Sequence, residues 1–325
     1  MRIAAILSLS EDQQGAGELP SSSIFKSHHA RDLSYVQTEI LGKSLLDRTL
    51  TKLQQFGIAQ HTIISEEAEL LPRRTLSHGI DEWEGAVANY VREGIDLLLF
   101  QRISTYSDVD FMQLLRFHLE NENPVTQAYA SDGPLDVVLV DASRLRGIPG
   151  AIRRSFGTLL AQQARFMYRG YVNRLARPQD FYRLIDDGLR GRCKLRPIGV
   201  ESKEWVWQGA DAHIDASAIV SGPAFIGAGA SIGACCKVAS GSSIERDCEV
   251  DCGTVVEQSW VTQETYLGVA LDVRRAIVTA SKLFHLDRNV EVEIGDRHLI
   301  GAAGKPAAIF AGLGSLLWGE SSPAS

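Results

Sequence analysis

Two aspartates, Asp108 and Asp110, are well placed in this chain to hold a divalent cation. They lie two residues apart in the stretch YSDVDFMQLLRFH, directly before apolar residues at helical spacing. Carboxylate oxygens are ligands that Mg²⁺ accepts, and Mg²⁺ orients the phosphates in phosphoryl transfer. Acidic residues at such a place also cap a helix and complement its dipole. We expect capping, by Ser107 or Asp108, and keep the two aspartates as alternative metal-binding carboxylates.

A Gly-Ala-Gly segment, Gly15 to Gly17, offers one candidate for a phosphate-binding loop. It follows the first apolar stretch only after Glu11 and Asp12. Backbone amides of a glycine-rich loop can surround phosphate oxygens, but two acids beside the loop repel a triphosphate. We therefore interpret this segment as a flexible loop.

Cysteine and histidine residues show no spacing typical of a metal site. The cysteines form no CxxC pair and have no histidine at zinc-finger distance. We expect all five to be reduced thiols: Cys193, Cys235, Cys236, Cys248 and Cys252. His28 and His29 fall in a polar stretch, and His118 falls on a helical pattern beside apolar residues. These patterns predict no metal-binding residues.

The first half of the chain alternates strand and helix patterns. Such alternation predicts crossover connections and a parallel sheet with helices on its faces, which is a Rossmann-like α/β domain. Strands are expected at 2–9, 61–65 and 95–100, and helices at 44–57, 82–94, 109–122 and 157–168. Residues 124–141 predict a hairpin that turns at Asp132 and Gly133.

The second half carries an aliphatic residue at every sixth position. A helix requires apolar spacings of three and four, and a half-buried strand a spacing of two, so a period of six indicates stacked coils of a parallel β-helix. The aliphatic column is Ile214, Val220, Ile226, Ile232, Val238, Ile244, Val250 and Val256. A second column holds only small side chains: Ala218, Ala224, Ala230, Cys236, Ser242, Cys248 and Thr254. The pattern is regular from Ala212 to Val256, and we extend the coil to about Gly301.

Composition and charge exclude some classes of function. The 325 residues are 45% hydrophobic and 22% charged, which is ordinary for a globular chain of about two domains. A net charge of −7 argues against a nucleic-acid partner, because phosphate backbones are bound through lysine and arginine. The N-terminus has no export-signal pattern, so we expect a cytoplasmic protein. The apolar stretch 307–319 is too short for a transmembrane segment and is expected to pack or to join copies in an oligomer.

An α/β domain followed by a hexapeptide coil resembles the sugar-1-phosphate nucleotidyltransferases, among them the N-acetylglucosamine-1-phosphate uridyltransferases. The stretch ILGKSLLDRTLTKLQQFGI is similar to the family segment that follows the nucleotide loop, and RGYVNRLARPQDFYRLIDDGLRG to the end of the catalytic domain. The resemblance implies a nucleotidyltransferase-like α/β domain at 1–205, a left-handed parallel β-helix of hexapeptide repeats at 206–301 and a tail at 302–325. It also implies a trimer, with a dimer as the alternative.

The resemblance also implies where catalytic groups should stand, and this chain departs from the pattern there. Where the family has a metal-binding aspartate at the end of a buried strand, this chain has Gln101 and Arg102, and Asn173 replaces the second carboxylate. We therefore expect no catalytic residues and no cofactor, with Mg²⁺ needed only if transferase activity survives. Gln101, Arg102 and Asn173 are the candidate residues for binding a nucleotide or sugar phosphate. Arg102 could bind phosphate or pair with an acid of the cleft.

The resulting interpretation is a protein of nucleotide-sugar or exopolysaccharide metabolism that has lost the metal-dependent transferase site and binds or regulates instead. One alternative is an active nucleotidyltransferase whose metal site has moved to Asp108 and Asp110. Another is a hexapeptide-repeat acyltransferase, which requires a histidine base. His213 and His285 flank the coil, whereas residues 214–284 contain no histidine.

Overall fold

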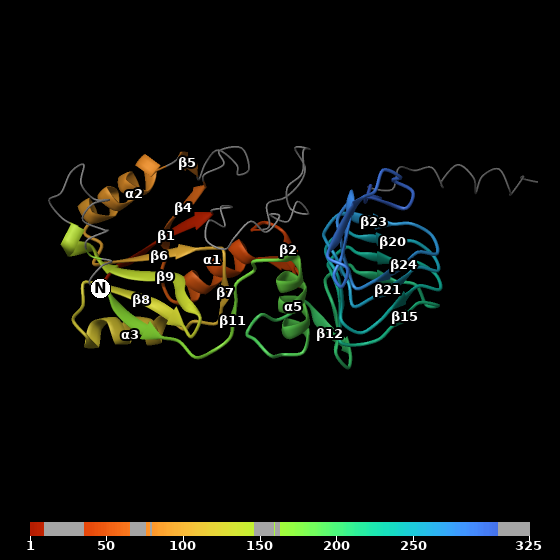
Figure 1. The fold of residues 1–325 in the computed structure, drawn as a ribbon, viewed down its shortest axis with the longest axis horizontal. Coiled ribbons are helices and arrows are strands. Elements are labelled where there is room, and N and C mark those ends of the chain that lie inside the picture. The colour runs from red at the N-terminus through yellow and green to blue at the C-terminus, as the bar shows by residue number, and fades with distance from the viewer. Residues whose placement is uncertain (10–35, 66–75, 79, 146–158, 160–162, 305–325) are drawn as a thin grey trace, which may run out of the picture.

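The computed structural model describes residues 1–9, 36–65, 76–78, 80–145, 159 and 163–304. An α/β part and a stack of short strands lie side by side, with helix α5 between them (Figure 1). The expected loop at Gly15 to Gly17, the pair His28 and His29, and residues 305–325 of the apolar tail lie outside the described residues. No helix in the described ranges is long and apolar enough to cross a membrane.

The α/β part is built on a seven-stranded sheet in the order β10-β8-β9-β6-β1-β4-β5. Strands β4 and β6 both pair parallel with β1, as the alternating pattern predicts. Strand β9 runs antiparallel to β6 and to β8, so the sheet is mixed, and the predicted hairpin at Asp132 and Gly133 is confirmed. The strands are β1 (Ile3–Leu9), β4 (Gln60–Ser65), β5 (Leu76–His78), β6 (Leu97–Arg102), β8 (Val125–Ala130), β9 (Gly133–Asp141) and β10 (Ala164–Met167).

The helix predicted at 157–168 is helical at Leu159 but wrong toward its C-terminal end. Within 157–168, residues Ala164–Met167 form strand β10, which pairs parallel with β8. The burial of this strand alternates from residue to residue, and Phe166 packs edge-on against Phe117 of the neighbouring helix at 5.4 Å between ring centroids. Pairing with β8 therefore overrides the local helical pattern at this edge of the sheet.

Helices cover both faces of this sheet because its strands are apolar on both sides. Alternate residues of β1 separate the two faces: Ala4 and Ile6 pack with α2, whereas Ala5 and Leu7 pack with the cluster that contains α1 and α3. The helices are α1 (Leu45–Gln55), α2 (Ile80–Arg92), α3 (Phe111–Glu120) and α5 (Pro178–Leu189), with a 3₁₀ turn η2 (Ala142–Leu145). Ser44 caps α1 by accepting from the Asp47 amide, and Gly57, at a φ of 75°, follows its end.

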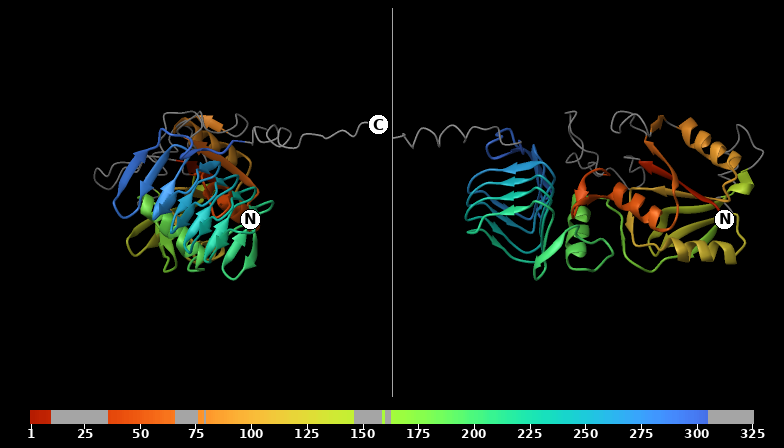
Figure 2. Two further views of the ribbon diagram at one scale, coloured as in Figure 1. Left: turned by 90° about the vertical axis from the view of Figure 1, so that its right-hand side faces the viewer. Right: turned by 180° about the vertical axis from the view of Figure 1, so that it is seen from behind.

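The second part is a coil in which the chain visits three sheets in rotation, here called the three-sheet coil (Figure 2). The eight-stranded sheet holds β12 (Val200–Lys203), β13 (Val206–Gln208), β16 (Ala224–Ile226), β19 (Ser242–Ile244), β22 (Trp260–Val261), β25 (Ala276–Val278), β26 (Lys282–His285) and β27 (Val290–Glu293). The five-stranded sheet holds β14 (His213–Ile214), β17 (Ser231–Ile232), β20 (Glu249–Val250), β23 (Thr265–Leu267) and β28 (Ile300–Ala302). The four-stranded sheet holds β15 (Ile219–Val220), β18 (Lys237–Val238), β21 (Val255–Glu257) and β24 (Asp272–Arg274).

The period-six column explains the stacking of the coil. Ile214 pairs with Ile232, and Ile232 with Val250, so one turn of the coil at positions 214, 232 and 250 takes three six-residue steps. After Val256 each turn is a residue shorter, because Val256 pairs with Val273 and Val261 with Val278. This one-residue change is why the sequence period blurs there. Parallel stacking ends at β25, and the later strands β26, β27 and β28 pair antiparallel.

The column of small residues has a second role that size alone does not reveal. Its hydroxyl and thiol groups donate to backbone carbonyls fourteen residues further on, in the next turn of the coil. The pairs are Cys236 to Val250, Ser242 to Val256, Cys248 to Thr262 and Thr254 to Gly268. These bonds join neighbouring turns of the coil, and the carbonyls of Val250 and Val256 also accept from the backbone amides of Gly233 and Ala239. Cys236 and Cys248 are therefore structural thiols, and all five cysteines are free.

One outer face of the three-sheet coil is buried against the α/β part. Phe225, Trp260 and Ile277 point outward from the eight-stranded sheet, yet all three are fully buried and belong to the same core cluster as α1 and α5. Trp260 stacks on Phe181 of α5 with 6.3 Å between ring centroids and 12° between the planes. The two parts therefore share a continuous apolar core.

Replacing the buried Ile232 with aspartate should unfold the three-sheet coil. Ile232 is fully buried among apolar residues, so a carboxylate there has no partner, and we expect a loss of about 4 kcal/mol or more. Circular dichroism during urea unfolding measures the loss. Ser231→Asp places the same group on the partly exposed side of the same strand and should cost little. Equal stability of the two variants would show that the aliphatic column does not line the interior.

Candidate functional site

A cavity of about 390 Å³ opens at the carboxyl end of strand β6. Its walls come from α1, from residues 101–110 after β6 and from the segment that follows α5. The lining residues are Lys43, Leu45, Arg48, Thr49, Thr51, Lys52, Gln55, Phe56, Gln101, Ile103, Thr105, Tyr106, Ser107, Asp108, Val109, Asp110, Lys194, Leu195 and Ile198. This volume is within the range of small-molecule sites.

The topology of the sheet explains why a cavity forms here. From β1 the chain passes through α1 to β4 on one side, and then through α2 to β6 on the other side of β1. Connections that leave in opposite directions open a crevice at the carboxyl ends of the neighbouring strands, and ligands of open α/β sheets bind in such crevices. The cavity therefore lies where this kind of fold places a ligand.

The charges of the cavity are predominantly positive. Four cations line it, Lys43, Arg48, Lys52 and Lys194, against two carboxylates, so the walls carry an excess of two positive charges. Within the described ranges, no three His, Cys, Asp or Glu side chains gather as metal ligands would. This arrangement attracts an anion rather than a cation.

Both carboxylates of the cavity already accept hydrogen bonds from the protein. Asp108 accepts from the Tyr106 hydroxyl at 2.7 Å and from the Lys194 amide at 2.8 Å. Asp110 caps α3 by accepting from the Met112 amide at 2.8 Å. Capping by Ser107 or Asp108 is therefore wrong, because α3 starts at Phe111 and its N-cap is Asp110. The pKa of Tyr106 is raised well above its usual range, first by burial and then by the charge of Asp108.

Lys52 is the most perturbed cation of the cavity. Its ammonium donates to the Val109 carbonyl and lies 4.3 Å from the centre of the Phe111 ring. Burial lowers its pKa to about 8 from 10.5. Attraction by Asp108 and Asp110 opposes this lowering, whereas repulsion by Lys194 adds to it. Two cations of the same cavity therefore destabilise one another.

Gln101 and Arg102 lie on opposite faces of the sheet, since neighbouring residues of a strand point to opposite sides. Gln101 and Ile103 line the cavity on the side of α1, and the Gln101 Oε1 atom is buried with no hydrogen bond from the described part of the chain. Arg102 is exposed and lies on the face that α2 covers. The structure thus brings together Gln101, Asp108 and Asp110 but not Arg102.

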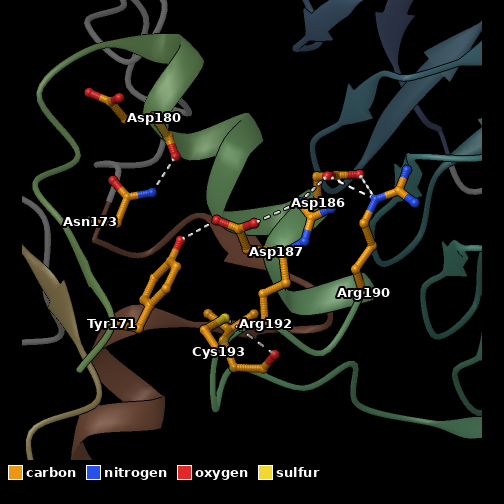
Figure 3. Close-up of polar contacts among 9 residues, drawn as sticks. Tyr171, Asn173, Asp180, Asp186, Asp187, Arg190, Arg192 and Cys193 are labelled. Atoms are coloured by element: carbon orange, nitrogen blue, oxygen red, sulfur yellow. Dashed lines mark hydrogen bonds and ion pairs between the residues drawn. The ribbon is translucent and has the colours of Figure 1, made fainter.

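Asn173, the third candidate, also lies away from the cavity lining. It is buried in strand β11 (Val172–Asn173), which pairs with β7 (Tyr106–Ser107). Its amide donates to the Asp180 carbonyl at 2.8 Å and its Oδ1 accepts from the Leu175 amide at 3.0 Å (Figure 3). Both polar groups of Asn173 therefore hold the turn that enters α5.

A tight turn between β2 (Glu39–Ile40) and β3 (Lys43–Ser44) connects the cavity to the three-sheet coil. The turn residues Leu41 and Gly42 have φ values of 55° and 84°, so their two amides point the same way. A Cβ atom at Gly42 would lie 2.9 Å from the Phe225 ring, so glycine is required there. Glu245 of the coil accepts from the Leu41 amide at 2.9 Å and from the Gly42 amide at 2.8 Å.

Arg48 holds the opposite side of the same turn. Its guanidinium donates to the carbonyls of Ile40 and Leu41, both at 2.9 Å, and to the Lys43 carbonyl at 3.2 Å. Arg48 also lines the cavity. We call Glu245, Arg48 and residues 40–43 the turn clamp. It places Lys43 at the wall of the cavity through a carboxylate that comes from the other part of the molecule.

Sequence patterns did not reveal Lys43, Lys52, Lys194 and Glu245. Arg48 and Lys52 do stand four residues apart in the helical pattern of α1, which was a signal for a shared basic face. Glu245 directly follows an aliphatic column residue and is itself followed by Arg246 and Asp247, so the sequence does not distinguish it from a surface acid. No local signal places Lys194, because it reaches the cavity only through tertiary packing.

Comparisons with known proteins give little guidance. No protein-family model and no curated protein matches this chain. Among solved structures, it is similar to a protein from Bacillus anthracis described as a glucose-1-phosphate thymidylyltransferase, in complex with sucrose. The identity is 11% and the TM-score 0.42, over 61% of this chain and 97% of the other.

The turn clamp predicts a pH dependence of stability. Burial raises the pKa of Glu245 to about 7 from 4.5, against hydrogen bonds from Ser243 and the two amides. The folded state therefore binds the proton more tightly than the unfolded state. The contribution of Glu245 is complete below pH 4.5 and is lost as the pH rises through 7. Relative to Glu245→Gln, wild-type stability should fall by a few kcal/mol over this window.

Urea unfolding at several pH values measures this difference. Glu249→Gln is the matched control, since Glu249 is exposed on the same coil and should show no such window. If the free energies of unfolding of wild type and Glu245→Gln differed by a constant amount from pH 4.5 to 7, the raised pKa of Glu245 would be contradicted.

Proposed function

We propose that this chain is a sugar-nucleotidyltransferase-like protein of nucleotide-sugar or polysaccharide metabolism that binds a phosphorylated small molecule without transferring a nucleotide. The observation that carries the proposal is the cavity at the carboxyl end of β6, with four cations and two carboxylates that are already hydrogen-bonded. A phosphorylated ligand supplies the missing negative charge. The ligand class therefore follows from the charge of the cavity walls.

The absence of a transferase reaction in this proposal has a chemical reason. Nucleotidyl transfer brings two anions together, and magnesium on carboxylate ligands neutralises the developing charge. In the cavity Asp110 is engaged as a helix cap, and Asp108 holds Tyr106 and the Lys194 amide. A metal ion on the same oxygen atoms would compete with bonds on which α3 and the cavity wall depend.

The proposal also covers the architecture of the whole chain. Under it, residues 1–205 form the nucleotidyltransferase-like domain, 206–301 a left-handed β-helix of hexapeptide repeats, and 302–325 a tail. The chain contributes strands to three sheets in turn, which supports a β-helix. The last strands of this part pair antiparallel. A cytoplasmic homo-oligomer, a trimer before a dimer, completes the proposal, and light scattering of the full chain would measure its size.

The binding part is tested by titration calorimetry with glucose 1-phosphate, N-acetylglucosamine 1-phosphate, uridine triphosphate and thymidine triphosphate. Each titration is run once with Mg²⁺ and once with EDTA. We expect at least one of these ligands to bind, and to bind as tightly in EDTA, because lysines supply the positive charge. Binding that requires Mg²⁺, or no binding by any of the four, would contradict the proposal.

The catalytic part is tested by pyrophosphate release from the same triphosphates, with the sugar 1-phosphates and Mg²⁺ present. One charge-stabilising donor is typically worth about 10²- to 10³-fold in rate, so we expect release at background. Strong release that Asp108→Asn or Asp110→Asn abolishes would instead show an active enzyme with a relocated metal site.

A further inference from the structure

Three lysines reach the cavity from separate segments of the chain. Lys43 comes from β3 at the turn clamp, Lys52 from the last turn of α1 and Lys194 from the segment after α5. Within the described ranges, none of the three has a carboxylate oxygen within 4.0 Å of its ammonium group. The ion pairs of these ranges are formed by other residues.

The lysine ammonium groups keep donors for a ligand. The Lys43 ammonium donates to the Thr51 hydroxyl, and the Lys52 ammonium to the Val109 carbonyl. An ammonium group has three N–H donors, so each of these two retains two. Lys194 is exposed, and its backbone amide rather than its ammonium binds Asp108.

Other residues of the cavity lining suit the organic part of a ligand. Leu45, Phe56 and Ile103 contribute apolar surface, whereas Thr49 and Thr105 contribute hydroxyl groups that can donate or accept. Gln101 also lines the cavity, although its Oε1 atom is itself enclosed by protein. The hydroxyl groups of Thr49 and Thr105 can pair with those of a polyhydroxylated molecule.

From this arrangement we infer that Lys43, Lys52 and Lys194 hold the phosphate of a sugar phosphate directly, with no metal ion between, while the sugar lies toward Gln101. The inference rests on the proposed function and names the ligand class and the residues of its site. A phosphate dianion would neutralise the charge excess of the cavity, and it would replace the repulsion between Lys52 and Lys194 with shared attraction to one group.

The charge state of Lys52 gives the inference a second observable. Asp108, Asp110 and Lys194 are the charged groups that act on Lys52, and its pKa is about 8. A bound dianion raises this pKa, so a protein near pH 8.5 takes up protons when the ligand binds. Phosphate monoesters are already dianions there, since their second pKa is about 6. Affinity should therefore fall as the pH rises above 8.

The experiment titrates the full chain with glucose 1-phosphate in EDTA, by calorimetry in two buffers of different ionisation enthalpy at pH 8.5. Lys52→Met and Lys194→Met should each weaken binding about tenfold or more, as loss of a charge-assisted bond does. Lys52→Met should also abolish the proton uptake. Lys203→Met is the matched control, because Lys203 is exposed on β12, outside the cavity, and should bind as wild type does.

The remaining outcomes separate this inference from the proposed function. Lys194→Met removes an exposed side chain, so its fold is expected to survive even if Lys52→Met melts early. Wild-type affinity in Lys194→Met and Lys52→Met, with loss in Arg102→Ala, would place the phosphate on the opposite face of the sheet and overturn the inference alone. Failure of the wild-type protein to bind any of the four ligands would overturn both.

Discussion

The turn clamp is the interaction on which the relation between the two parts of the molecule depends. Glu245 leaves the three-sheet coil with no solvent exposure and accepts the two amides that the positive φ values of Leu41 and Gly42 direct toward it. A buried carboxylate is costly unless its lone pairs are used, and here Ser243 and two amides use them. Arg48 binds the carbonyls of the same turn. The backbone amides of the turn thus bind Glu245 from the coil, and its carbonyls bind Arg48 from α1.

The consequence for the cavity is direct. Lys43 follows the clamped turn, and Arg48 forms part of both the turn clamp and the cavity. The Ile198 amide donates a hydrogen bond to the Leu41 carbonyl at 3.0 Å, and Ile198 also lines the cavity. The outer face of the coil adds Phe225 and Trp260 behind this turn. The coil therefore supports one wall of the cavity, in addition to any role in oligomerisation. A molecule in the cavity would contact Lys43 and Arg48, which are held by the junction between the two parts.

The parts of this structure that sequence could predict are those set by a repeated local constraint. The coil follows from its period of six, and α1 follows from Ser44, Gly57 and the apolar spacing between them. Strand β10 was missed because four residues at a sheet edge owe their conformation to β8 rather than to their own pattern. The shorter turn of the coil after Val256 was missed for the same reason, since one absent residue leaves no signal except a blurred period.

The candidate site was predicted less well, because it is assembled by contacts distant in sequence. Gln101, Asp108 and Asp110 do line the cavity, yet strand alternation separates Arg102 from them and Asn173 is engaged in the turn before α5. The resemblance to nucleotidyltransferases pointed to positions where the family has carboxylates and this chain does not. The lysines that give the cavity its positive charge stand elsewhere, at Lys43, Lys52 and Lys194. Their convergence depends on the clamp and on the packing of α5, which no short motif encodes.

A crystal structure of the full chain with glucose 1-phosphate, grown in EDTA, tests the central claim most directly. The account predicts phosphate density within hydrogen-bond distance of the Lys52 and Lys194 ammonium groups, with the turn clamp intact and no metal ion beside the phosphate. Phosphate density at Arg102 on the opposite face of the sheet, or an ordered cation between the phosphate and Asp108, would contradict it.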